Sequence, residues 1–146
     1  MEPSQTANAL YKYHTEHNGE TVEKLVQECH QYNCKINGWH HQKLKLGCFG
    51  FDNLVVSLCY ALDKIDSEST ENEIAEWIHQ GWVLNYIYWR DHNPWEKEAS
   101  RNKPAKPLND DRRNLCAQTK FSDLPNDEKE KDLIIARWIQ KKFFET

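Results

Sequence analysis

Hydrophobic residues recur every three or four positions over most of the chain, a spacing that is typical of helices with one buried face. The pattern predicts a helix that begins after Thr21 and ends at Asn37-Gly38, where glycine favours a left-handed terminus. A second predicted helix begins at Asp52 or Asn53 and buries Leu54, Val55, Leu58, Cys59, Leu62 and Ile65. These two helices supply part of the predicted core.

The last predicted helix begins at Ser122 or Asp123 and has Pro125 in its first turn. Its buried face should contain Leu133, Ile134, Ile135, Trp138 and Ile139. Weaker patterns predict a short helix over residues 6–17, a small strand or hairpin within 39–51, an exposed loop over 96–114 and an extended segment over 115–121.

The stretch from Glu73 to Trp95 holds four of the six tryptophans. Thr70 and Glu73 form a capping box, so a helix should begin near Glu71, and Asn93-Pro94 should end it because proline disfavours a helical residue before it. The apolar residues of this helix fall on two faces, one with Ile74, Trp77, Ile78, Gly81 and Tyr88 and another with His79, Trp82, Tyr86 and Trp89. Since a surface helix needs one apolar face, the second face must contact another part of the chain or a ligand.

Composition favours one mostly α domain over residues 1–146, with short β segments. A net charge of −4 and a sequence pI near 6.0 argue against nucleic acid and anionic membranes as partners. No apolar run approaches the roughly 20 residues that span a membrane, and residues 1–8 do not resemble a signal peptide. Five cysteines, an odd number, favour reduced thiols and a cytoplasmic location.

The residues that could carry chemistry do not form an established motif. Cysteines and histidines gather at Cys29, His30, Cys34, His40, His41 and Cys48, but their spacing matches no zinc site. There is no Gly-x-Ser-x-Gly elbow and no phosphate-binding glycine loop. We therefore expect no catalytic residues, no metal and no cofactor, and we do not expect an enzyme.

The second face of the aromatic helix is the candidate binding site. Its rings could stack on a flat ligand or surround a cation, and nearby basic groups could supply polar contacts. The candidate ligand-binding residues are His79, Trp82, Tyr86, Trp89, Arg90, Trp39 and His30. Aromatic residues at helical spacing are more often core residues, so burial of the same rings is the competing interpretation.

The chain also contains a weak internal repeat, with half-repeats of roughly residues 20–66 and 70–144. Residues 25–31 parallel 74–80, and Phe51-Asp52-Asn53-Leu54 parallels Phe121-Ser122-Asp123-Leu124. A true repeat predicts two helix pairs packed about a pseudo-two-fold axis, with His30 and His79 equivalent. Chance similarity between any two helix pairs is the alternative.

Two motifs in the second half resemble the ryanodine-receptor (RyR) domain. The first is Ile74-Ala75-Glu76-x-x-His79-x-x-Trp82, which resembles the opening helix of that domain. The second is Cys116 followed by Phe121-x-Asp123-Leu124-Pro125-x-x-Glu128-Lys129-x-x-Asp132, which resembles its closing motif. The family's Gly-Trp-x-Tyr-Gly is missing between them, and segment 96–114 is longer than the family loop.

The resemblance implies a mostly helical module, arranged as a divergent tandem pair, that binds and packs without catalysis. Such domains occur in ryanodine receptors and in small bacterial and phage proteins, whose contexts suggest sensing of nucleotide-like ligands. We therefore expect a module that senses or sequesters a small nucleotide-like or aromatic ligand. The alternative is a protein-interaction or homodimerisation module that uses the same aromatic surface, and a small enzyme or metalloprotein is the third choice.

Overall fold

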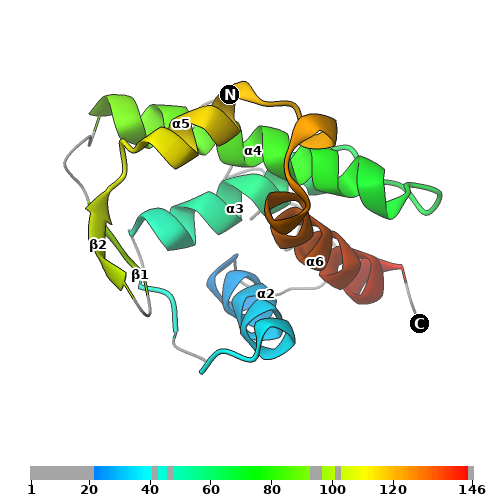
Figure 1. Cartoon of the computed structure of the whole chain (residues 1–146). Helices are drawn as coiled ribbons and strands as arrows, with labels where there is room; N and C mark the ends of the chain where they lie inside the picture. The colour runs from blue at the N-terminus through cyan, green and yellow to red at the C-terminus, as the bar shows by residue number, and fades with distance from the viewer. Residues whose placement is uncertain (1–21, 41–42, 46–47, 93–96, 101–102, 145–146) are drawn as a thin grey trace.

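Two helices packed side by side form the centre of the computed structural model, α3 (Phe49–Leu62) and α4 (Glu71–His92) (Figure 1). The structure describes residues 22–40, 43–45, 48–92, 97–100 and 103–144, so the predicted helix over 6–17 lies outside the described residues. Helix α2 (Val22–Asn37) packs against α3 and α6 (Asn126–Phe143), and α6 also packs along α4. The described chain is mostly helical, as the hydrophobic pattern predicts.

The contact between α3 and α4 is close because Gly81 lacks a side chain. A Cβ atom at this position would lie 2.9 Å from the Cα atom of Ser57 and 3.0 Å from the carbonyl oxygen of Val56. Both of these are backbone atoms, which cannot move aside as the end of a flexible side chain can. Glycine inside a helix costs about 1 kcal/mol relative to alanine, and here it allows the two backbones to approach.

The buried residues form two clusters. The larger one lies among α2, α3, α4 and α6 and includes Leu25, Leu58, Ile78 and Ile139. The smaller one consists of Phe49, Tyr86 and Leu108, with Trp82, Trp89 and Ala117 packed against it. Most predicted core positions are confirmed, since Val55, Leu58, Cys59, Leu62, Ile134, Trp138 and Ile139 are all buried.

The predicted ends of α2 and α4 are confirmed. Gly38 follows α2 with a φ of +69°, a conformation that glycine adopts without strain. At the start of α4 the backbone N–H of Glu73 donates to the Thr70 hydroxyl at 3.1 Å, and the N–H of Thr70 donates to the Glu73 carboxylate at 3.0 Å. Helix α4 ends at His92, directly before Asn93-Pro94.

Segment 96–114, predicted as an exposed loop, contains regular structure instead. Strands β1 (Lys97–Ser100) and β2 (Lys103–Pro107) form an antiparallel hairpin at one end of the molecule (Figure 1). Prolines fit such a two-stranded ribbon because its outer edges need no partner. Leu108 follows and is fully buried, which anchors this segment to the core.

Helix α5 (Asp111–Gln118) replaces the extended segment that was predicted over 115–121. The carboxylate of Asp110 caps it by accepting from the N–H of Arg113 at 2.7 Å. A short 3₁₀ helix, η1 (Phe121–Asp123), then precedes α6, so α6 begins at Asn126 rather than at Ser122 or Asp123. The sequence pattern does not separate η1 from α6, because both contain polar residues that are typical of helix caps.

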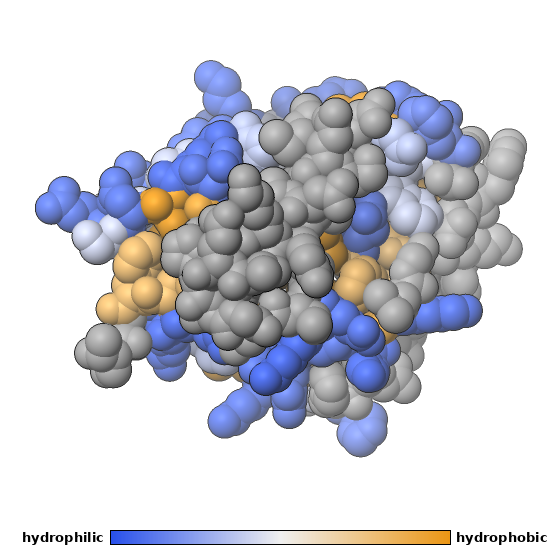
Figure 2. Space-filling view, turned by 180° about the vertical axis from the view of Figure 1, so that it is seen from behind, coloured by the Kyte–Doolittle hydropathy of each residue, from blue (hydrophilic) through white to orange (hydrophobic). Residues whose placement is uncertain are grey.

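Helix α3 begins at Phe49 with Cys48 as its cap, earlier than the predicted cap at Asp52 or Asn53, because the Cys48 sulfur accepts from the N–H of Phe51 at 3.4 Å. Residues 43–45 form no strand, so the described part of 39–51 lacks the predicted hairpin. In the rear view, the visible hydrophobic residues form small separate groups among hydrophilic ones (Figure 2). No helix in the described ranges is long and apolar enough to cross a membrane.

Candidate functional site

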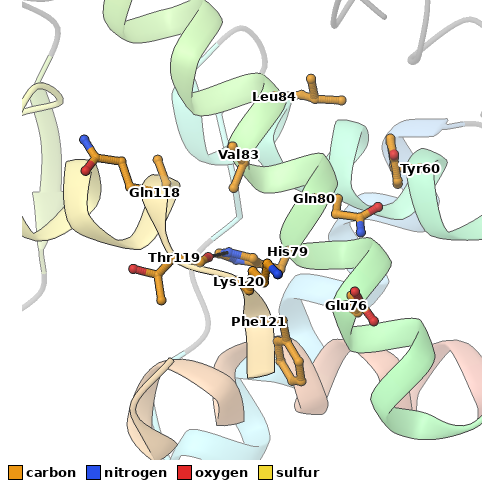
Figure 3. A pocket seen from close by; sticks show the side chains of 11 residues that line it. Tyr60, Glu76, His79, Gln80, Val83, Leu84, Gln118, Thr119, Lys120 and Phe121 are labelled. Carbon is orange, nitrogen blue, oxygen red and sulfur yellow. Dashed lines mark hydrogen bonds between the residues drawn. The ribbon is translucent and has the colours of Figure 1, made fainter. Parts of the chain in front are cut away.

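An open cleft of about 360 Å³ lies between α4 and the segment that joins α5 to η1 (Figure 3). Helix α4 contributes one wall, with side chains spaced one turn apart, and residues 117–121 contribute the other. Tyr60 reaches the cleft from α3. The lining residues are Tyr60, Glu76, His79, Gln80, Val83, Leu84, Ala117, Gln118, Thr119, Lys120 and Phe121.

His79 joins the two walls of the cleft. Its side chain is buried, and its Nε2 atom lies 2.8 Å from the carbonyl oxygen of Thr119. The imidazole stacks on the indole of Trp82, with ring centroids 6.1 Å apart and planes 10° apart. The ring therefore helps to fix the position of Thr119 relative to α4, because it stacks on Trp82, lies against Phe121 at a tilt of 52° and is held at one nitrogen.

The second nitrogen of the imidazole faces Asp132 on α6. Nδ1 lies 3.8 Å from the Oδ2 atom of Asp132, which is longer than a direct hydrogen bond. Burial, followed by repulsion from Glu128, raises the pKa of Asp132 to about 8, although the positive charge of Lys131 opposes this change. Asp132 is therefore a neutral carboxylic acid at pH 7 and can donate a hydrogen bond towards His79.

The charged side chains near Asp132 form ion pairs with one another. Glu128 accepts from the Arg112 guanidinium at 2.7 Å and from the Lys131 ammonium at 3.2 Å. Burial alone would raise the pKa of Glu128, but Lys131 and Arg112 together hold it below the ordinary value. Cys116 lies close to this group, and burial raises the pKa of its thiol. A thiol with a raised pKa is a poor nucleophile at neutral pH.

Four polar side chains that line the cleft have no intramolecular partner among the described residues. Glu76, Gln80, Gln118 and Lys120 make no hydrogen bond or ion pair there through their side chains. Glu76 and Gln80 lie one turn apart on α4, while Lys120 belongs to the opposite wall (Figure 3). These groups are available to a ligand, whereas the apolar surface between them comes from Val83, Leu84 and the ring of Phe121.

The structure brings the predicted aromatic face together, but as packing. Trp82 stacks on Tyr86 with centroids 5.1 Å apart, and the Tyr86 hydroxyl bonds to the Leu108 carbonyl at 2.9 Å and to the Asn114 side chain at 2.8 Å. Tyr86 has an exposed fraction of 0%. Its placement in the ligand-binding set is therefore corrected, since α5 and Leu108 cover the ring.

The remaining predicted site residues are divided between two regions. Arg90 lies by Tyr86 and donates to the Asn114 side chain at 3.2 Å, and Trp89 donates to Asp52 at 2.7 Å. His30 lies on α2, where its Nε2 atom is 3.6 Å from the sulfur of Cys34, and Trp39 follows the end of α2. Helix α2 packs against α3 and α6, while the cleft lies beside α4 and α5, so only His79 among the predicted ligand residues lines the cleft.

Sequence reasoning missed most of the cleft. Gln80, Val83 and Leu84 lie on a third face of α4, outside the two predicted apolar faces, and residues 117–121 fall in the segment that the pattern predicts as extended. The Ile74-Ala75-Glu76-x-x-His79 motif was the one signal that pointed here, because Glu76 and His79 both line the cleft. Across the residues that the structure describes, no three His, Cys, Asp or Glu side chains are grouped to hold a metal ion.

No protein-family model matches the chain, and no curated protein or solved structure matches it either. Membership of the RyR-domain family therefore stays a prediction from the two motifs, and the cleft itself has to support any functional argument.

Proposed function

We propose that this chain is a non-enzymatic binding module that holds a small, planar, nucleotide-like ligand in the cleft between α4 and residues 117–121. The observation that carries the proposal is the combination of a largely apolar cleft with polar side chains, Glu76, Gln80, Gln118 and Lys120, that have no partner among the described residues. Ligand sites are typically concave and largely apolar, with a few polar groups that fix orientation. The cleft volume of about 360 Å³ falls at the lower end of the usual range for such sites.

The polar groups define the chemistry of the ligand. Glu76 offers a carboxylate that accepts from N–H donors, and Gln80 offers an amide that both donates and accepts. Lys120 on the opposite wall offers a positive charge to an anionic group. A base with adjacent N–H donors, such as guanine, matches the first pair, and its phosphate matches Lys120. The apolar contacts of Val83 and Leu84 suit the face of the base.

Isothermal titration calorimetry with adenosine, guanosine, cytidine and uridine monophosphates tests this function. We expect binding of at least one nucleotide, with guanosine monophosphate the strongest. Gln80→Ala and Glu76→Gln should each weaken that binding at least threefold, because each removes a contact from an exposed or half-buried side chain without disturbing the core.

The matched control is Gln31→Ala, which removes the same side chain from an exposed position on α2. It should bind like the parent protein. Absence of binding by all four nucleotides would contradict the proposed ligand class, and equal effects of Gln80→Ala and Gln31→Ala would contradict the proposed site.

A protein-interaction module is the second candidate, and it is favoured by exposed apolar side chains outside the cleft. Leu115 on α5 is 65% exposed, and Ile87 and Tyr88 on α4 are 37% and 38% exposed. Light scattering at increasing protein concentration tests self-association. A mass that rises with concentration and falls back in Leu115→Ser supports this function, whereas a constant monomer mass contradicts homodimerisation.

We also propose that the chain is a divergent RyR-domain pair whose halves, roughly 20–66 and 70–144, are related by a pseudo-two-fold axis. Its support is the parallel order of an amphipathic helix, a connection and a Phe-x-x-Leu segment at Phe51 and Phe121. Those segments take different conformations, because Phe51 lies inside α3 and Phe121 begins the separate η1 turn. Superposition of one half on the other tests this relation.

A further inference from the structure

The buried ring of His79 connects the cleft wall to the interior through its two nitrogens. The carbonyl oxygen of Thr119 can only accept, so the Nε2 atom that lies 2.8 Å from it must carry the proton. A neutral imidazole has one N–H group, and Nδ1 is then the unprotonated nitrogen that faces Asp132 at 3.8 Å. The tautomer is therefore fixed by Thr119 as long as Asp132 does not compete for the N–H.

The surroundings of Asp132 determine when it competes. From α6, Glu128 and Lys131 face this region, and from α5, Arg112 and Cys116 do so. Both cations bind Glu128, and within the described ranges His79 is the only basic side chain within 4.0 Å of the Asp132 carboxyl group. An ionised Asp132 would thus lie buried beside another carboxylate, with the imidazole as its nearest available donor.

We propose that the single N–H of His79 switches from the Thr119 carbonyl to the Asp132 carboxylate when Asp132 loses its proton, and that this switch releases the Thr119 wall of the cleft. Asp132 gives its proton to solvent, and the imidazole proton leaves Nε2 while Nδ1 gains one. The net change is the loss of one proton. The new hydrogen bond is favoured because a bond to a carboxylate is stronger than one to a backbone carbonyl.

The consequence for the cleft follows from the position of Thr119. After the switch its carbonyl has lost its hydrogen-bond donor on α4, so the wall formed by residues 117–121 is held to α4 by the packing of Phe121 without this bond. Because burial places the pKa of Asp132 at about 8, the wall is held at neutral pH and released in mildly alkaline solution. The effect on ligand affinity rests on the proposed function, whereas the switch itself does not.

Nitrogen-15 NMR of the histidine side chains in the ligand-free protein tests the switch directly, because the two tautomers have distinct nitrogen shifts. Between pH 6 and pH 10 we expect the His79 ring to change from the Nε2–H to the Nδ1–H tautomer with a midpoint near 8, and the Thr119 amide signal to move with the same midpoint. His92 is the internal control, since its Nδ1 atom donates to the Tyr88 carbonyl at 2.8 Å and should show no tautomer change.

Two variants separate the switch from a merely structural role. Asp132→Asn cannot ionise, so His79 should keep the Nε2–H tautomer over the whole range. Glu128→Gln removes the neighbouring negative charge and should move the midpoint to lower pH, which keeps the test usable if Asp132→Asn does not fold. A His79 ring that keeps Nε2–H up to pH 10 in the parent protein, or a midpoint that does not move in Glu128→Gln, would overturn the proposal.

Nucleotide affinity at two pH values tests whether the His79 switch changes the cleft. Affinity for guanosine monophosphate should fall at least fivefold between pH 7 and pH 9 in the parent protein and change less than twofold in Asp132→Asn. A tautomer change without this difference overturns the coupling to the cleft. Failure of the nucleotide to bind at either pH counts against the proposed function alone, and the movement of the Thr119 amide then decides whether the wall is released.

Discussion

The indole N–H of Trp89 donates a hydrogen bond to the Asp52 carboxylate at 2.7 Å, and so joins the C-terminal part of α4 to the first turn of α3. The indole also packs edge-on against Phe49, with ring centroids 5.8 Å apart. Burial raises the pKa of Asp52, and the hydrogen bond from Trp89 partly opposes this rise. Trp89, one of the predicted ligand-binding residues, thus connects α4 to α3.

Trp89→Phe should lower the free energy of unfolding by about 1–2 kcal/mol, because it leaves a half-buried carboxylate without its donor. Urea denaturation at pH 7 measures this change. Asp52→Ala removes the acceptor, and the Trp89→Phe/Asp52→Ala double variant completes a thermodynamic cycle. Additive effects of the two substitutions would show that the Trp89–Asp52 hydrogen bond contributes no coupling.

Gly81→Ala should destabilise the protein by about 1–3 kcal/mol despite the higher helix propensity of alanine. The added Cβ would lie 2.9 Å from the Cα atom of Ser57, so α3 and α4 must move apart. The matched control is Asn72→Ala, at an exposed position of the same helix, which should change stability by less than about 0.5 kcal/mol. A more stable Gly81→Ala protein would show that the helices separate without cost.

Thr70→Ala should cost about 1 kcal/mol, because the N–H of Glu73 loses the hydroxyl that caps α4 at 3.1 Å. Thermal unfolding followed by circular dichroism gives the comparison. Thr70→Ser retains the hydroxyl and should remain close to the parent protein. If Thr70→Ser and Thr70→Ala lower the unfolding midpoint equally, the stabilisation by Thr70 comes from its methyl group and not from the cap.

Asp132 should make the stability of the parent protein fall as the pH rises. Its pKa is about 8 in the folded protein and near 3.8 when unfolded, so the unfolded chain releases the proton first. The stabilising contribution of the neutral acid is complete below about pH 4 and is lost between about pH 4 and pH 8. The slope from this group is at most about 1.4 kcal/mol per pH unit.

Asp132→Asn has no proton to release, so it should gain stability relative to the parent protein through the same pH range. Guanidinium denaturation at pH 4, 6 and 8 measures the difference. We expect the two proteins to be similar at pH 4 and to diverge steadily towards pH 8. Parallel stability profiles would contradict a neutral, buried Asp132.

The sequence predicted elements well where local chemistry decides them. The Thr70–Glu73 cap and Gly38 each act within a few residues, and both define helix ends in the structure. Helix α4 ends at His92, where the sequence places its stop. The hairpin and α5 were missed because Leu108 anchors that segment through a long-range contact with Tyr86, which no local pattern reveals.

The cleft was hard to predict for a related reason. Periodicity identifies the faces of α4 that carry apolar residues, and it correctly singled out Tyr86 and Trp82 as a group. It does not say which face the rest of the chain covers. Leu108 and α5 cover the aromatic face, so the open surface is the less conspicuous one with Gln80 and Val83.

The most direct test of the proposed function is an NMR titration of the labelled protein with guanosine monophosphate at pH 7, with the backbone amide shifts followed residue by residue. We predict saturable shifts at Gln80, Thr119 and Lys120 and no shift at Gln31 on α2. Saturable shifts confined to α2, or no saturable shift at any of the three cleft residues, would contradict a nucleotide site between α4 and residues 117–121.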